Sequence, residues 1–220
     1  MRHFQEQLKS LEADLLKMAA TVELSISNCV TALIDRNEQQ AQSVLDREAV
    51  VNQLEIQVDA AATRALALYQ PMAGDLRLVT AAMKINTDLE RMGDLATNVA
   101  ERALSLIHRP PVRIPIHITR MASLAQAMVR DSVQAFVHRD ARQARQILIS
   151  DDAVDQSCDA LLTEQIELMR TNPAMIAQGV DLVLVANDLE RIADHATNIA
   201  ESVIFVVQGV DIRHHSEAKV

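Results

Sequence analysis

A passage of fourteen consecutive residues occurs twice in this chain of 220 residues, and most of the positions that stay the same are polar. The passage runs from Asp88 to Glu101 and returns one hundred positions later, from Asp188 to Glu201, with ten of its fourteen residues unchanged. A repeat that served packing alone would need to preserve only its apolar period. Because the preserved residues include carboxylates, we infer that they have a role beyond packing.

The acidic residues of this repeat fall on one stripe of a helix. With about 3.6 residues per turn, residues spaced by three and four positions lie one above the other. The residues connected in this way are Glu90, Asp94, Asn98 and Glu101 in the first copy, and Glu190, Asp194, Asn198 and Glu201 in the second. The residues predicted to face the core from the opposite side are Leu89, Met92, Ala96 and Val99. The acidic stripe is therefore predicted to face away from the core.

A second acidic pair precedes each copy of the repeat. Glu55 and Asp59 are spaced by four, and so are Asp155 and Asp159 one hundred positions later. Pro71 predicts a turn between the helix of the first pair and the helix of the repeated passage. Counted in residues from this turn, the pair at 55 and 59 and the pair at 90 and 94 lie at comparable heights along their helices. Each half is therefore predicted to carry two acidic pairs on neighbouring helices.

Carboxylates gathered on adjacent helices repel one another unless a cation neutralises them. An all-oxygen set suits hard cations such as Mg²⁺, Ca²⁺, Mn²⁺ or iron. Because the repeated set contains neither His nor Cys, a tetrahedral structural zinc site is disfavoured. The other interpretation is a solvated helix face whose ion pairs contribute little to stability. The spacing alone leaves both interpretations open.

The sequence lacks GxxxxGK[ST], GxGxxG and HExxH, the usual signatures of phosphate cradles and zinc hydrolases. The alternative function is a carboxylate-bridged metalloenzyme on a helical bundle. Such enzymes use inward-facing Glu-x-x-His pairs, whereas the acidic residues here are spaced by four. His195 follows Asp194, but its counterpart in the first copy is Leu95. We therefore expect His195 to be solvated or to support a ligand, and we expect no enzymatic activity.

Composition predicts an all-α protein. Apolar residues make up 49% of the chain, aromatic residues only 2%, and Gly and Pro are few, which favours long helices over sheets. The net charge of −9 opposes binding to nucleic acid. Cys29 and Cys158 lie in helical stretches without a CxxC pattern, which indicates buried free thiols in a reducing cytoplasm. Neither a secretory signal nor an uncharged membrane span is recognisable.

Proline and polar runs divide the chain into six predicted helices, at about residues 4–36, 38–69, 72–108, 115–137, 140–171 and 173–208. Three antiparallel helices bury their apolar stripes where one helix cannot. We therefore expect two tandem three-helix bundles, related by the internal repeat, at residues 1–109 and 114–220. The polar tail after Gly209 is expected to be frayed, and its His214 and His215 to be tail residues rather than metal ligands.

At these residues the chain resembles the PhoU family of regulators of bacterial phosphate-specific transport. The motifs that carry the resemblance are Glu-Arg-Met-Gly-Asp at 90–94, Glu-Arg-Ile-Ala-Asp at 190–194 and Gln-Pro-x-Ala-x-Asp-Leu-Arg at 70–77. The resemblance covers nearly the whole chain. Two residues depart from the family pattern: Ala193 replaces a usual glycine, and Tyr69 stands where an arginine often precedes Gln-Pro.

The resemblance implies a cytoplasmic, non-enzymatic negative regulator of phosphate uptake and of the phosphate-starvation response. It further implies a homodimer that links the ATP-binding subunit of the phosphate ABC transporter to a phosphate-sensing histidine kinase, and that reaches the membrane only through these partners. Iron or zinc ions are implied cofactors. By position, the implied metal ligands are Glu55, Asp59, Glu90 and Asp94 in the first half, and Asp155, Asp159, Glu190 and Asp194 in the second. Asn98, Glu101, Asn198 and Glu201 would support them.

Overall fold

The computed structural model describes residues 2–212, which form six long helices and one short 3₁₀ turn. The helices of the first half are α1 (Arg2–Asp35), α2 (Glu38–Tyr69) and α3 (Ala73–Ile107). Those of the second half are α4 (Ile116–His138), α5 (Ala141–Thr171) and α6 (Ile176–Gln208), with the turn η1 at Pro173–Met175. The predicted all-α class, the six helices and the internal repeat are confirmed. The sixth helix begins three residues later than expected, because Pro173 opens the 3₁₀ turn instead.

The polar runs between helices are capping sequences. Asn37 accepts a hydrogen bond from the Gln40 amide at 3.1 Å and caps α2. Asp140 accepts hydrogen bonds from the amides of Arg142 and Gln143 at 2.9 and 3.0 Å and caps α5. The side chains thereby satisfy backbone donors that have no partner within the helix. Equivalent caps thus begin the second helix of each bundle.

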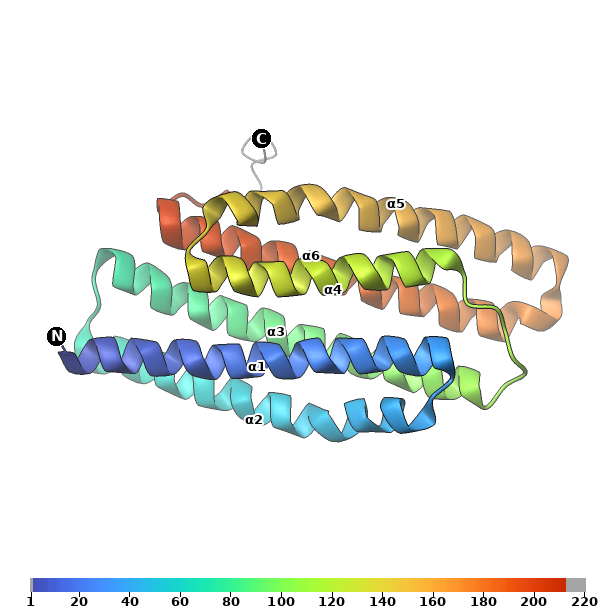
Figure 1. The fold of residues 1–220 in the computed structure, drawn as a ribbon, viewed down its shortest axis with the longest axis horizontal. Helices are drawn as coiled ribbons and strands as arrows, with labels where there is room; N and C mark the ends of the chain where they lie inside the picture. The colour runs from blue at the N-terminus through green and yellow to red at the C-terminus, as the bar shows by residue number, and fades with distance from the viewer. Residues whose placement is uncertain (1, 213–220) are drawn as a thin grey trace.

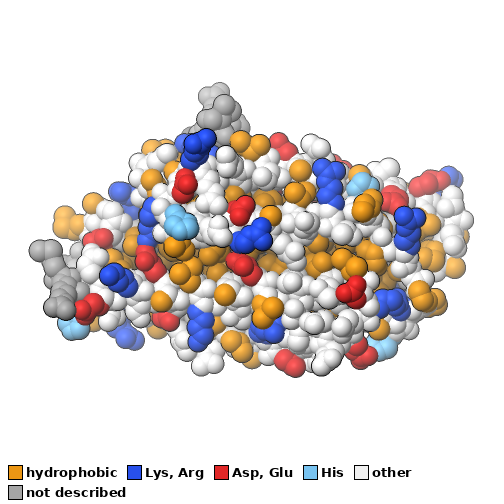
Figure 2. Space-filling model, in the orientation of Figure 1, with side chains coloured by type: hydrophobic (Ala, Val, Ile, Leu, Met, Phe, Trp, Pro, Cys, Tyr) orange, Lys and Arg blue, Asp and Glu red, His pale blue; other side chains and the backbone are white. Residues whose placement is uncertain are grey.

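The two three-helix bundles lie side by side along their length (Figure 1). Helix α3 packs against α6, and α1 contacts α4. Buried apolar residues of all six helices form one continuous core. The side chains of Leu89, Met92, Ala96 and Val99 are fully buried, which confirms the predicted core face of α3. On the face shown in Figure 2, apolar side chains gather along the seam between α1 and α4.

The start of the segment between the bundles is held by side chains of both bundles. The Arg36 guanidinium donates to the Ile107 and Arg109 carbonyl oxygens at 2.6 and 2.9 Å. The Arg109 guanidinium in turn donates to Asp181 on α6 at 3.1 Å, and the Ser105 hydroxyl donates to the same oxygen at 3.0 Å. These contacts connect α1, the end of α3 and α6, so the bundles are joined by side chains as well as by the chain.

Cys29 and Cys158 are both buried and free, as predicted. None of the helices between Arg2 and Ile212 contains an apolar stretch of the length that a bilayer crossing requires. His214 and His215 of the tail lie outside the described residues.

Candidate metal site and the contacts between the repeats

The first acidic cluster lies where α2 and α3 pack together. The buried Asn86 amide on α3 donates to the Glu55 carbonyl oxygen at 3.0 Å and to the Asp59 carboxylate at 3.3 Å, both on α2. One turn further along α3, Glu90 lies within electrostatic reach of both Glu55 and Asp94. The structure thus brings Glu55, Asp59, Glu90 and Asp94 to the contact between α2 and α3, at the matching heights that the turn at Pro71 predicts.

Gly93 determines how closely α2 and α3 approach each other beside this cluster. A Cβ atom at this position would lie 3.1 Å from Val51 Cγ1 on α2, which is closer than side chains normally pack. Because glycine has no Cβ atom, α3 lies directly against Val51, and the acidic side chains on either side of this contact are close together. In the second half Ala193 takes this place and is fully buried.

The surroundings of Glu90 oppose its ionisation. Partial burial raises the pKa of Glu90, the negative charges of Asp94 and Glu55 raise it further, and only Arg91 lowers it. Arg91 Nε lies 3.4 Å from Glu90, and Arg91 Nη1 lies 3.7 Å from Asp94. The Glu90 side chain is 18% exposed and that of Asp94 40% exposed. The predicted outward stripe is wrong in this respect, because Glu90 is largely buried beside Glu55 of α2 rather than in open solvent.

The second cluster contains a thiol. The Cys158 thiol on α5 donates to Glu190 Oε2 on α6 at 3.4 Å. Burial raises the pKa of Cys158 to about 12, and the charges of Glu190, Asp159 and Asp155 contribute to this shift. The pKa of Asp194 is also raised, by burial and by Asp155. Three of the four predicted acidic residues of this half therefore lie around Cys158, and the fourth, Asp194, lies within electrostatic reach of Asp155. The counterpart of Cys158 in the first half is Val58.

The donor chemistry of both clusters fits a hard cation, but the side chains are not arranged as a formed site. Among residues 2–212, no three Asp, Glu, His or Cys side chains converge on one point. Asp59, Asp155, Asp159 and Asp194 are exposed, so their side chains have room to rotate inward. In the first cluster, the buried Asn86 also has an amide oxygen without a hydrogen-bond partner. The residues present thus fit an oxygen-seeking metal that would draw them together.

The two asparagines of the repeat do not extend the metal stripes, contrary to expectation. Asn198 Nδ2 donates to Asp88 Oδ1 on α3 at 3.2 Å, and Asn98 is hydrogen-bonded to Asp188 on α6. The asparagine of each copy therefore binds the first aspartate of the other copy. These preserved residues join the two repeats. Of the remaining stripe residues, Glu101 is exposed and Glu201 lines a cleft between α3 and α6.

Two further side chains strengthen this contact between the repeats, and each belongs to one copy only. His195 Nδ1 lies 2.9 Å from Asp88 Oδ1 and only 19% of the side chain is exposed. Of the two roles expected for His195, the solvated one is therefore wrong. Arg102 Nε donates to Asp188 Oδ2 at 3.3 Å. The Asp188 side chain is only 8% exposed. Burial raises the pKa of Asp188, and Arg102 lowers it.

Sequence analysis missed Asn86 as a member of the first cluster. It precedes the repeated passage, which begins at Asp88, and its counterpart is Ala186, so comparison of the two halves does not reveal it. Its spacing of four residues from Glu90 is the signal that places it on the same face. The contact between Cys158 and Glu190 had no comparable signal, because it depends on how α5 packs against α6.

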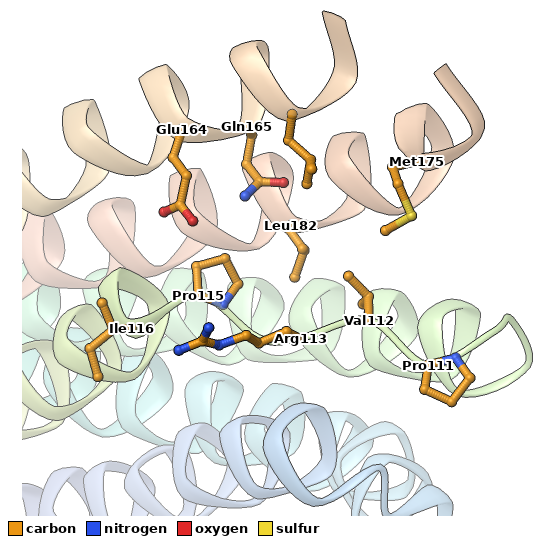
Figure 3. Close-up of a pocket in the computed structure, with 10 residues that line it drawn as sticks. Pro111, Val112, Arg113, Pro115, Ile116, Glu164, Gln165, Met175 and Leu182 are labelled. Carbon is orange, nitrogen blue, oxygen red and sulfur yellow. The ribbon is translucent and has the colours of Figure 1, made fainter. Parts of the chain in front are cut away.

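A cavity of about 410 Å³ lies between the segment that joins the bundles and the facing ends of α5 and α6 (Figure 3). Pro111, Val112, Pro115 and Leu182 contribute apolar walls, and the buried Gln165 lies above them. None of the residues that line this cavity belongs to either acidic cluster. The cavity is therefore separate from the candidate metal site.

Comparison with known proteins gives full-length matches. The family model of the PhoU domain matches residues 15–103 and 118–203. The phosphate-specific transport system accessory protein PhoU homolog of Pseudomonas aeruginosa is 36% identical over 97% of this chain and 88% of that protein. The homolog of Aquifex aeolicus is 37% identical over 97% of this chain and 96% of that protein.

Two crystal structures have the same fold. PhoU from Pseudomonas aeruginosa aligns with a TM-score of 0.91 and 36% identity, covering 94% of this chain and all of that one. The phosphate transport system regulatory protein PhoU from Streptococcus pneumoniae aligns with a TM-score of 0.88 and 29% identity, covering 94% and 98%. Each of the two ranges that match the PhoU domain lies within one three-helix bundle.

Proposed function

Because the chain belongs to the PhoU family, we propose that it is a regulatory accessory protein of phosphate-specific transport that restrains phosphate uptake and the phosphate-starvation response. The observation that carries this proposal is the match of both repeats to one family domain, together with relatives that are transport accessory proteins over nearly their whole length. The chain is accordingly a regulator and not an enzyme.

We further propose that the protein acts in the cytoplasm as a homodimeric adaptor. Its partners would be the ATP-binding subunit of the phosphate ABC transporter and the phosphate-sensing histidine kinase, and it would reach the membrane only through them. The bundle presents long helical faces that fit such a role, including the apolar seam between α1 and α4 (Figure 2).

The acidic clusters are proposed to bind metal ions, with iron or zinc suggested by the family resemblance and Mg²⁺, Mn²⁺ or Ca²⁺ compatible with oxygen ligands. The support is electrostatic. In both clusters partial burial, and after it the charges of neighbouring carboxylates, raise the pKa values of Glu90 and Asp194 and so oppose their ionisation. A bound cation would reverse this penalty, because it favours the ionised form of each carboxylate.

The test combines metal binding with partner binding. Glu90→Ala with Asp94→Ala should lose metal from the first cluster, measured by elemental analysis and by Mn²⁺ titration, while circular dichroism remains that of a helical protein. Glu167→Ala is the matched control, because Glu167 is an exposed carboxylate on α5 that pairs with Arg170 outside both clusters. The parent protein should also retain the transporter ATP-binding subunit in a pull-down. Failure to do so with and without metal would count against the adaptor role.

The carboxylate-bridged metalloenzyme is not supported. His195, the histidine nearest to the second cluster in sequence, is bonded to Asp88 of the other repeat. The family comparison likewise indicates a transport regulator.

A further inference from the structure

Gln165 of α5 is a buried polar residue that lines the cavity beside the segment between the bundles. Only 1% of the residue is exposed, and its side-chain oxygen has no hydrogen-bond partner among the residues that the structure describes. Figure 3 shows the Gln165 side chain pointing from α5 towards Pro115 and Leu182, so that its amide group lies among the side chains that line the cavity. Buried amide oxygens nearly always have a partner, and leaving one unpaired costs stability.

The neighbouring part of α6 places no side chain over this oxygen. A Cβ atom at Gly179 would lie 3.5 Å from Gln165 Oε1 and only 2.9 Å from Met169 Cγ. Because glycine has no Cβ atom, α6 lies close to α5 here and leaves the oxygen uncovered. A donor for Gln165 would therefore have to come from a molecule in the cavity.

The other walls of the cavity determine which molecule can supply this donor. The side chains of Val112, Pro115 and Leu182 are apolar, whereas the charged lining residues, Arg113 and Glu164, are both exposed to solvent. A water molecule needs two to four polar partners, which apolar walls do not supply. The volume of about 410 Å³ lies within the range of about 300–1,000 Å³ found for sites of small organic molecules. The cavity thus fits a neutral, mostly apolar molecule with a hydrogen-bond donor.

We propose that this cavity binds a small neutral molecule with an apolar body and an N–H or O–H donor, and that the Gln165 side-chain oxygen accepts the hydrogen bond. Indoles and phenols are of this class, because each combines an apolar ring with one donor. Such a ligand would contact the segment between the bundles, α5 and α6 together, since all three contribute to the walls. The site is separate from the acidic clusters, so the proposal does not depend on metal binding.

Binding of indole to the full chain tests the proposal. The chain contains no tryptophan, so indole fluorescence reports on the added ligand alone. Benzofuran is the matched ligand, because it has the same shape with an oxygen atom in place of the N–H donor, and its affinity is measured by displacement of indole. We expect the parent to bind indole about threefold to tenfold more tightly than benzofuran, the range for one hydrogen bond between neutral groups.

Three variants locate the binding and its hydrogen bond. Gln165→Met keeps an unbranched side chain of similar length without the acceptor, so it should bind indole and benzofuran equally well. Val112→Phe should weaken the binding of both ligands, because the larger side chain occupies part of the cavity. Asn86→Leu is the matched control. Asn86 also has a buried side-chain oxygen without a partner in the described part of the chain, but it does not line this cavity, so the preference for indole should equal that of the parent.

Equal affinities for indole and benzofuran in the parent would overturn the proposal, and so would an unchanged preference in Gln165→Met. Binding that Val112→Phe leaves unaffected would place the ligand elsewhere and would overturn it as well. If Gln165→Met fails to fold, the two ligands compared in the parent and in Val112→Phe decide alone. A parent that binds no indole but binds a peptide containing tryptophan would assign the cavity to a side chain of a partner protein, and the small-molecule ligand would be rejected.

Discussion

At the scale of single residues, the acidic clusters are sites where the folded state holds a proton more tightly than the unfolded chain does. Glu90 is the clearest case, because burial, Asp94 and Glu55 all raise its pKa above the usual 4.5. The folded protein therefore binds more protons in the pH range above 4.5, and its free energy of unfolding falls as the pH rises through the folded pKa. This loss of stability comes from the ionised carboxylate of Glu90. It should therefore change when Glu90 is substituted and when a metal ion binds.

Glu90→Gln should stabilise the metal-free protein at neutral pH and have little effect at about pH 4, where the carboxyl is largely protonated in both states. With saturating Mn²⁺ the parent should be the more stable of the two proteins, because it keeps Glu90 as a proposed metal ligand. Urea unfolding at both pH values, with EDTA and with Mn²⁺, measures the difference. Glu167→Gln should not stabilise the protein, since Arg170 lowers the pKa of Glu167. A parent more stable than Glu90→Gln in EDTA at neutral pH would contradict the assignment.

Cys158 should be almost unreactive towards iodoacetamide at neutral pH, since the thiolate is the nucleophile and the pKa of the thiol is raised to about 12. Glu190→Gln removes one of the charges that raise this pKa, so alkylation should become faster. The pKa of Cys29 is also raised to about 12 by burial, and its side chain is fully buried. Cys29 should remain unlabelled in both proteins. Mass spectrometry after timed labelling would show this, and fast alkylation of Cys158 in the parent would contradict it.

At the scale of helices, a side-chain N-cap begins the second helix of each bundle. Asn37 and Asp140 occupy equivalent capping positions, and the residues before them, Arg36 and Arg139, have left-handed backbones with φ of 52° and 54°. The turn therefore depends on one polar side chain in each bundle. Asp140 accepts hydrogen bonds from two backbone amides and Asn37 from one.

Asp140→Ala should lower the free energy of unfolding by about 1 kcal/mol, because two backbone donors lose their acceptor. Asn37→Ala should lower it by a similar or smaller amount. Asp152→Ala, an exposed position within α5, should change it by less than about 0.5 kcal/mol. Chemical unfolding at neutral pH compares the three variants, and equal effects at Asp140 and Asp152 would show that the cap contributes nothing.

At the scale of the whole molecule, the two repeats are joined by a reciprocal arrangement. Asp88 binds Asn198 and His195 of the second repeat, while Asp188 binds Asn98 and Arg102 of the first. The Asp188 side chain is more deeply buried than that of Asp88, with 8% of it exposed against 15%, and it forms the ion pair with Arg102. The integrity of the α3–α6 interface should therefore depend more on Asp188 than on Asp88.

Arg102→Leu should lower the free energy of unfolding by about 3 kcal/mol at neutral pH, because it leaves a buried carboxylate without its cation. Without Arg102 the pKa of Asp188 should rise further, so the deficit should shrink as the pH falls and Asp188 takes up a proton. Arg170→Leu, which breaks an exposed pair, should cost less than about 1 kcal/mol. Equal losses in the two variants, independent of pH, would contradict a buried ion pair between the repeats.

The apolar period, the helix breaks and the duplicated acidic pairs are local properties of the chain, and they suffice to predict six helices and two repeats. They also predict that Glu55 and Glu90 lie at comparable heights on neighbouring helices, because a short turn leaves two such helices little freedom in their relative heights. Leu89 and Met92 are likewise assigned to the core by spacing alone.

Only the tertiary structure decided which helix packs against the other faces of α3 and α6. Asn98 belongs to the same helical stripe as Glu90, yet it binds Asp188, and His195 binds Asp88 instead of solvent. The spacing of residues gives a direction around one helix, but it does not say which helix occupies that direction. In this protein the neighbour comes from the other repeat, about one hundred residues away in the chain. Its position is set by the packing of one core shared by both bundles.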